Sequence, residues 1–380
     1  MKILMVNSGV YPMPTFQGGL ENVVYALSNN LAERGIEIDL VTDVSENAKF
    51  HENINIFKIG LPELHVFQWG FLGYVLRHIL GGFLAFRKAK SLFGGHYDAV
   101  HVHGRLGPLL LTIFNRGRQK LVYTIHDDSP NRQLSGYLVF LASYKLCIEP
   151  AARRASKVIV LHEDGRRHFL FNGVDEKRIN VIPNGVNTKL FRKRNLEKNN
   201  HCLFVGSLTA RKGVKYLLQA MSLIPELEAV VVGDGTERKN LENMASELGI
   251  NGRIKFLGLI RDSDSLSCFY SQASFLVLPS LTEGLPLVVP EAMACGTPVI
   301  ASNLPGNAAL VRNHDTGFLF EVGNYIDLAE KIKLLVGRSS KCREMGNRAQ
   351  QLVLQNYSFD TVVLNTINVY KSIFSERASA

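Results

Sequence analysis

The glutamates at positions 283 and 291 have the clearest capacity for chemistry. Glu283 lies in a glycine-containing loop after an apolar run, and Glu291 lies one to two turns inside the helix predicted after that loop. Eight helical residues span about 12 Å, whereas the two carboxylates of a retaining glycosidase lie about 5 Å apart. The spacing therefore excludes an acid–nucleophile pair. It favours two separate carboxylates that accept hydrogen bonds from hydroxyl groups on two different sugars.

Two glycine-containing loops are suited to phosphate. Gly18 and Gly19 follow the first predicted strand and open an amphipathic helix, so their backbone N–H groups are accessible to an anion. A plain turn before a helix has the same pattern. The segment 205–213 occupies the equivalent place in the second half of the chain and adds two cations, Arg211 and Lys212. These cations can neutralise a diphosphate leaving group.

Three histidines accompany predicted strands. His126 directly follows an apolar run, and a single histidine in that position is more often structural than functional. His101 and His103 alternate along an earlier run, so both side chains lie on one face of a strand. Such a pair suits metal ligation, but the sequence identifies no third ligand, and we predict no metal site.

Two other motifs are similar to ligand sites but have simpler interpretations. Asp262 and Asp264 form an Asp-x-Asp sequence that immediately precedes a predicted helix, which is typical of an N-cap. Gly233 and Gly235 begin a turn similar to a dinucleotide fingerprint, but the third glycine of that fingerprint is absent, so NAD binding is not predicted.

The elements that must position these residues follow one repeated pattern. Short runs rich in Val, Ile and Leu alternate with amphipathic helical segments from residue 3 to 161, and the pattern restarts at residue 202. The alternation predicts parallel βαβ units. The restart predicts an α/β protein with two doubly wound, Rossmann-like sheets, one in each half of the chain.

A polar stretch at 192–200 has the composition of an exposed linker between these halves. We predict an N-terminal domain over 1–192 and a C-terminal domain over 193–358, followed by a C-terminal helix.

The sequence resembles the family 4 retaining glycosyltransferases of GT-B fold (glycosyl transferases group 1), which transfer a sugar from a nucleotide-activated donor. The most specific shared segment is 283–298, with its Glu-x7-Glu spacing followed by Ala-Met-Ala-Cys-Gly-Thr-Pro. Shared motifs also occur at 18–21, 181–187, 205–213 and 232–235. The similarity covers essentially the whole chain and is weakest over 45–97.

The resemblance implies which residues bind the nucleotide of the donor. Gly19, next to Gly18, donates its backbone N–H to the donor phosphate. Lys212 binds the diphosphate, and Glu291 holds the ribose hydroxyls. The donor itself is expected to be a UDP- or GDP-sugar.

The resemblance also implies which residues contact the transferred sugar. Glu283 binds hydroxyl groups of this sugar, with the backbone N–H groups of Gly284 and Leu285 beside the sugar or the phosphate. His126 matches the family histidine that reaches the donor sugar. His126, Lys212 and Glu283 are therefore the expected catalytic residues.

One position departs from the family pattern. Many members have an arginine where Ser207 stands, and that arginine pairs with the lysine on the phosphates. Serine cannot supply the charge, so we hypothesise that Arg211 replaces it.

The implied architecture is two Rossmann-like domains that face each other across a cleft. The N-terminal domain would bind the acceptor, the C-terminal domain the nucleotide sugar, and the helix at 359–380 would pack back on the N-terminal domain. The implied reaction retains the anomeric configuration, resembles that of hexosyltransferases, and needs neither a metal nor another cofactor, because the nucleotide sugar is a co-substrate.

Composition limits the classes of protein and of partner. The 380 residues carry a net charge of +9, with more of the excess in the first half, which favours anionic partners. No nucleic-acid recognition pattern is present. The five cysteines are too scattered for a disulfide framework, and the start of the chain is typical of a buried strand, so we expect a cytoplasmic protein.

The segment 64–90 combines apolar and aromatic residues with flanking cations. Two interpretations stay open: an interfacial helix that docks on an anionic membrane surface, which would make the protein peripheral at the inner membrane surface, or a buried helix packed on the first sheet. The paired glycines Gly81 and Gly82 argue against one uninterrupted helix.

The acceptor class also stays open. We favour a lipid-linked or glycan acceptor in cell-surface polysaccharide or glycolipid synthesis. The alternatives are a transferase that acts on a small soluble sugar or metabolite, a non-catalytic nucleotide-sugar-binding subunit, and a sugar-nucleotide 2-epimerase on a related fold.

Overall fold

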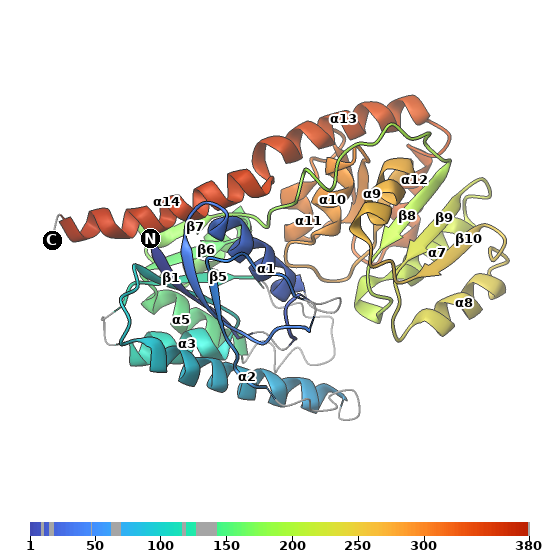
Figure 1. Cartoon of the computed structure of the whole chain (residues 1–380). Coiled ribbons are helices and arrows are strands. Elements are labelled where there is room, and N and C mark those ends of the chain that lie inside the picture. The colour runs from blue at the N-terminus through green and yellow to red at the C-terminus, as the bar shows by residue number, and fades with distance from the viewer. Residues whose placement is uncertain are drawn as a thin grey trace. The chain divides into compact units, whose positions relative to one another are not determined.

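Figure 1 shows the computed structural model, which describes the chain except residues 9–10, 15–18, 47, 62–69, 116–118, 127–142 and 379–380, and gives only the backbone at 70–72, 74 and 374–378. The chain divides into two compact units. Unit 1 comprises Met1–Pro183 and Val362–Ala380, and unit 2 comprises Asn184–Thr361. Each unit is built on its own parallel sheet.

Unit 1, as far as it is described, has a seven-stranded sheet in the order β3-β2-β1-β4-β5-β6-β7, with all neighbours parallel. Its strands are β1 (Lys2–Asn7), β2 (Glu37–Val41), β3 (Ile54–Phe57), β4 (Ala99–His103), β5 (Leu121–Ile125), β6 (Lys157–Val160) and β7 (Ile179–Val181). Its helices are α1 (Gly19–Ala32), α2 (Gly70–Leu92), α3 (Leu106–Phe114), η2 (Tyr144–Ile148), α5 (Glu149–Arg154), α6 (Glu163–Phe171), η3 (Glu176–Arg178) and most of α14 (Phe359–Ala378).

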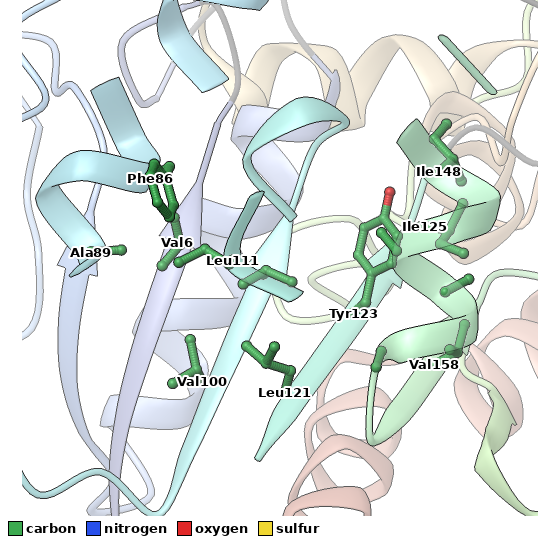
Figure 2. Packing of buried hydrophobic residues seen from close by; sticks show 14 of the residues in the cluster. Val6, Phe86, Ala89, Val100, Leu111, Leu121, Tyr123, Ile125, Ile148 and Val158 are labelled. Carbon is green, nitrogen blue, oxygen red and sulfur yellow. The ribbon is translucent and has the colours of Figure 1, made fainter. Parts of the chain in front are cut away.

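The strands of unit 1 send alternate side chains into two apolar layers. Leu4 of β1 faces the layer formed with α2, α3 and α5, whereas Ile3 faces the layer formed with α1 and α14. Figure 2 shows part of the first layer, where Phe86 of α2 lies close to Val6 of β1. Because helices cover both faces of a parallel sheet, its polar residues gather where the strands end.

Unit 2 has a six-stranded parallel sheet in the order β10-β9-β8-β11-β12-β13. Its strands are β8 (His201–Val205), β9 (Glu228–Val232), β10 (Ile254–Gly258), β11 (Phe275–Leu278), β12 (Val299–Ser302) and β13 (Gly317–Phe320). Its described helices are η4 (Ala210–Lys212), α7 (Val214–Ser222), α8 (Arg238–Glu247), α9 (Ser263–Gln272), α10 (Val288–Ala294), α11 (Pro305–Leu310), α12 (Tyr325–Lys333) and α13 (Ser339–Asn356). The predicted α/β class with two doubly wound sheets is confirmed.

The division between the units falls between Pro183 and Asn184, nine residues before the predicted boundary at 192/193. The segment after Pro183 already bonds to unit 2: Asn184 Nδ2 donates to the backbone oxygen of Leu285 at 3.0 Å, and Phe191 packs edge-on against Tyr270. The polar stretch at 192–200 indicated only the exposed part of the segment that joins the two units. The contacts of Asn184 and Phe191 show that unit 2 begins earlier.

The C-terminal helix α14 contributes to unit 1. Val363 and Tyr370 are fully buried in the apolar layer that also contains residues of β1 and α1. The chain therefore returns from unit 2 to complete the core of unit 1.

Helix α2 contradicts the expectation of a break at Gly81 and Gly82, because it runs without interruption for 23 residues. A Cβ atom on Gly82 would lie 2.9 Å from the Cβ of Leu106 and 3.1 Å from the backbone nitrogen of Gly107. The glycine therefore permits close packing of α2 on α3, which outweighs its low helix propensity. Among the described residues, no helix has the length and apolarity needed to cross a membrane.

Candidate active site

Two loops of unit 2 are joined through their backbones at the carboxyl ends of β8 and β11. The N–H of Leu281 donates to the backbone oxygen of Arg211 at 2.8 Å. Gly213 has a φ of 65°, and a Cβ atom there would lie 2.1 Å from the backbone oxygen of Pro279. Only glycine permits this conformation together with this approach. The loop that carries Lys212 is thus held against the loop that carries Glu283.

Lys212 and Glu283 form a largely buried ion pair. The Lys212 Nζ lies 2.5 Å from Glu283 Oε1, and the two side chains are 13% and 7% exposed. The hydroxyl of Ser280 donates to the same carboxylate oxygen at 2.6 Å. The sequence placed these two residues on separate loops, and the structure brings them into direct contact.

Burial acts on both charges of this pair. It raises the pKa of Glu283, but the Lys212 and Arg211 charges and two hydrogen bonds outweigh it, so the net pKa lies below the ordinary value. Burial lowers the pKa of Lys212, and the Glu283 carboxylate offsets part of that effect. The site therefore holds a fixed carboxylate beside a fixed ammonium, which together can bind an anion and hydroxyl groups.

Arg211 and Ser207 are both exposed. The Arg211 charge lowers the pKa values of Lys212 and Glu283, so it acts within electrostatic range of both side chains. Ser207 brings no charge.

The glycines at 233 and 235 serve backbone packing. A Cβ atom on Gly233 would lie 1.9 Å from the backbone oxygen of Gly206, and one on Gly235 would lie 2.4 Å from that of Leu208. The N–H of Leu208 donates to the backbone oxygen of Asp234 at 2.9 Å. The turn after β9 therefore supports the loop after β8.

Glu291 lies in α10, and its Oε2 accepts a hydrogen bond from the hydroxyl of Tyr270 at 2.8 Å. Burial raises the pKa of Glu291 to about 7, although the Tyr270 hydrogen bond lowers it. The carboxyl group therefore changes protonation near neutral pH. Sequence reasoning missed Tyr270, because a buried tyrosine in an amphipathic helix carries no signal for a partner 21 residues away.

Residues before and after the loop between Glu283 and Glu291 fix its backbone. Leu285 accepts the hydrogen bond from Asn184, and a Cβ atom on Gly306 would lie 1.5 Å from the backbone oxygen of Gly284. Gly284 and Leu285 therefore have fixed backbone positions next to Glu283. Asp262 caps α9 as predicted, with its carboxylate accepting the N–H of Ser265 at 2.8 Å.

In unit 1, Gly19 is the first residue of α1, and the backbone around it is open, since no heavy atom lies within 4 Å of an added Cβ. The buried Glu21 accepts the N–H of Tyr11 at 3.2 Å, which connects the helix to the loop after β1. Gly18 lies outside the described residues.

The three histidines form one cluster at the carboxyl ends of β4 and β5. His103 Nδ1 lies 3.0 Å from His126 Nε2. His101 bonds through Nδ1 to the hydroxyl of Tyr370 at 2.6 Å and through Nε2 to that of Thr124 at 2.7 Å. Burial lowers the pKa of His101 to about 3 and that of His103 well below its ordinary value. Both rings are therefore neutral.

Two family models match adjacent parts of the chain. Glycosyltransferase Family 4 matches residues 17–190, and Glycosyl transferases group 1 matches residues 186–352. Together the two matches span residues 17–352, which include every described strand except β1 and all of the site residues named above except Tyr11 and Tyr370.

Three relatives illustrate the range of similar sequences. The UDP-Gal:alpha-D-GlcNAc-diphosphoundecaprenol alpha-1,3-galactosyltransferase of Escherichia coli is 32% identical over 285 residues, 67% of this chain and 72% of the relative. An uncharacterized glycosyltransferase of Methanocaldococcus jannaschii is 28% identical over 403 residues, 98% of both chains. The D-inositol 3-phosphate glycosyltransferase of Corynebacterium glutamicum is 25% identical over 368 residues, 84% of this chain and 85% of the relative.

Solved structures share the fold over nearly the whole chain. Sucrose-phosphate synthase from Thermosynechococcus elongatus matches with a TM-score of 0.80 at 23% identity, over 99% of both chains. Anabaena Alr3699/HepE in complex with UDP matches with a TM-score of 0.78 at 22% identity, over 98% of this chain and 100% of the other. The expected GT-B fold of two Rossmann-like units is confirmed.

Proposed function

Since the chain belongs to glycosyltransferase family 4 and is a glycosyltransferase, we propose that it transfers a sugar from a UDP- or GDP-sugar to a lipid-linked or glycan acceptor with retention of configuration. The observation that carries this proposal is the buried pair of Lys212 and Glu283 on joined loops. A cation and a carboxylate fixed side by side suit the diphosphate and the sugar of one donor.

Donor binding exchanges the partners of this pair. The diphosphate carries more negative charge than one carboxylate, so it replaces Glu283 as the main partner of Lys212. The Glu283 carboxylate is then available to accept hydrogen bonds from hydroxyls of the transferred sugar. Lys212 stabilises the departing diphosphate, with the N–H groups of Gly284, Leu285 and Gly19 as further donors.

Glu291 is proposed to hold the two ribose hydroxyls. Both hydroxyls donate, so the ionised carboxylate is the form that binds them. Because its pKa is about 7, donor affinity rises as the pH increases through neutrality.

His126 is proposed to contact the donor sugar. We assign none of the described carboxylates as a covalent nucleophile, and we propose attack by the acceptor on the face from which the diphosphate leaves. The proposed reaction uses no metal and no cofactor besides the donor itself.

Arg211 is proposed to supply the charge that Ser207 lacks. The support is its electrostatic effect on both members of the buried pair. If Arg211→Ala leaves donor binding unchanged while Lys212→Ala abolishes it, the compensation is refuted.

A lipid-linked acceptor is favoured by the exposed face of α2. Leu76, Ile79 and Phe83 are 42%, 52% and 45% exposed, and they continue into the exposed cations Arg87 and Lys90 on the same side of the helix. An apolar stripe with adjacent cations suits the surface of an anionic membrane. We therefore propose a cytoplasmic protein that is peripheral at the membrane and contributes to cell-surface polysaccharide or glycolipid synthesis.

The E. coli relative, named for a diphosphoundecaprenol acceptor, supports this choice. The C. glutamicum relative, named for D-inositol 3-phosphate, supports the alternative of a small soluble acceptor. Of the segment 64–90, for which a membrane-docking role is proposed, residues 64–69 lie outside the described residues.

A thermal-shift panel tests the donor site. UDP, GDP, ADP and their common sugar derivatives are compared, because a ligand at ~100 times its dissociation constant stabilises the folded state by about 2.7 kcal/mol. We expect a selective shift with one base that Glu291→Ala removes and that Glu344→Ala, at an exposed glutamate of the same unit, preserves. No shift with any nucleotide would refute the proposed donor site.

A further inference from the structure

His103 connects the buried part of unit 1 to the histidine that the proposed function assigns to the donor sugar. It is the last residue of β4 and is fully buried. Its Nδ1 lies 3.0 Å from Nε2 of His126, which follows the neighbouring strand β5. The two ring centroids are 5.3 Å apart, and the ring planes are tilted by 36°. One N–H therefore bridges the two rings.

The direction of this hydrogen bond depends on where neutral His103 carries its single hydrogen. Its second nitrogen, Nε2, is buried and has no hydrogen-bond partner among the described residues. If His126 donated, the hydrogen of His103 would have to lie on Nε2 as a buried donor without an acceptor. If His103 donates, Nε2 keeps only a lone pair.

These two arrangements differ in cost. A buried N–H without an acceptor is among the rarest unsatisfied groups in folded proteins, and an acceptor that lacks a donor is tolerated more often. The arrangement in which the Nδ1–H of His103 donates to His126 is therefore favoured.

We propose that His103 is a positioning residue whose Nδ1–H donates to Nε2 of His126 and thereby fixes both the ring orientation and the tautomer of that histidine. Neutral His126 then carries its hydrogen on Nδ1. Its Nδ1 is then a hydrogen-bond donor, and it has no lone pair with which to remove a proton from the acceptor. The functional consequence rests on the proposed role of His126, whereas the tautomer itself does not.

His101 provides a matched comparison on the same strand. It is also fully buried and lies on the same face, with its ring centroid 4.3 Å from that of His103. Both of its nitrogens bond elsewhere, to Tyr370 and Thr124. A change at His101 therefore perturbs the packing of this region without removing the donor to His126.

Nitrogen-15 NMR of the full chain with labelled histidines tests the tautomer directly, with His126→Gln used to assign the His126 signals. We expect an unprotonated Nε2 and a protonated Nδ1 on His126, unchanged in His101→Gln. A protonated Nε2 on His126 would overturn the proposal. This measurement needs no substrate, so it stands even if the chain fails to bind a nucleotide sugar.

A pair of variants tests the positioning role. Asparagine at position 103 can place an amide N–H close to the former Nδ1, whereas phenylalanine keeps the ring shape without a donor. We expect His103→Phe to lower kcat for sugar transfer by roughly tenfold relative to His103→Asn, the scale of one lost hydrogen bond. Equal losses in both variants, in proportion to their loss of thermal stability, would show a structural role only and overturn the proposal. If His126→Gln is fully active, the assignment of His126 to the donor fails, and the NMR result still decides the tautomer.

Discussion

Replacing Tyr270 by phenylalanine should make donor binding depend more strongly on pH. The hydroxyl of Tyr270 donates to Glu291 at 2.8 Å and lowers the pKa of that carboxyl, which burial has raised to about 7. Tyr270→Phe removes this single oxygen from a fully buried side chain and leaves the ring in place. The carboxyl then loses a hydrogen bond that favours its ionised form, so its pKa rises further.

The size of the effect follows from the hydrogen bond. A hydrogen bond to a charged group contributes about 1.5–3 kcal/mol, and one pKa unit corresponds to about 1.36 kcal/mol, so the pKa should rise by roughly one to two units. At pH 7 the ionised fraction falls from about one half to between about 9% and 1%. If only the carboxylate binds the ribose, affinity weakens roughly 5- to 50-fold at pH 7 and about fourfold or less at pH 8.5.

Calorimetric titration between pH 6 and 8.5 measures the affinity of the unmodified chain and of Tyr270→Phe for a nucleotide. The ligand is the nucleoside diphosphate that gives the largest thermal shift. Tyr357→Phe is the control, because it also removes the hydrogen bond of a tyrosine hydroxyl in unit 2, here to the backbone oxygen of Ala309 at 2.7 Å. The control should keep the pH profile of the unmodified chain. A loss of affinity in Tyr270→Phe that is the same at every pH would refute the assignment of ionised Glu291 to the ribose.

Two further changes test the loops and the exposed helix. In thermal unfolding, Gly213→Ala should destabilise unit 2 by at least ~2 kcal/mol more than Gly249→Ala. Both positions have positive φ, but only at Gly213 would a Cβ atom lie against the backbone oxygen of Pro279. Equal losses of stability would show that this close approach is relieved at no cost. Phe83→Glu should reduce sedimentation with anionic liposomes several-fold. The control is Phe171→Glu, which changes a side chain that is 91% exposed elsewhere in unit 1 and should leave sedimentation unchanged. Equal effects of the two substitutions would argue against α2 as the docking face.

The sequence predicted the fold well where periodicity and burial agree. The run at 275–278 is apolar throughout, which indicates a buried strand, and it forms β11 over those residues. The short edge strands β3, β7 and β13 give no comparable signal in the sequence, because three or four residues show too little alternation. The domain boundary was displaced for a related reason: polarity indicates exposure, and the contacts of Asn184 and Phe191 that define unit 2 have no local signal.

Residues of the site were predictable by type, whereas their partners were not. The Glu-x7-Glu spacing identifies Glu283 and Glu291, but the contact of Glu283 with Lys212 joins positions 71 residues apart. That contact depends on the backbone bond between Leu281 and Arg211, which any residue except proline can make. The same holds for Tyr270, whose role depends on how α9 packs beside α10.

The partner exchange at the buried pair has a consequence for selectivity among ligands. In the chain without donor, Lys212 is satisfied by Glu283, and Glu291 by Tyr270. Breaking a buried ion pair by removing one partner costs about 3–5 kcal/mol, because the other charge stays buried and unpaired. A free nucleoside diphosphate can take Lys212 but offers no sugar hydroxyl to Glu283, whereas an intact nucleotide sugar satisfies both groups. On the proposed roles, the same ion pair that holds the empty site together therefore favours the substrate over the nucleotide product, and loss of the sugar promotes release of the diphosphate.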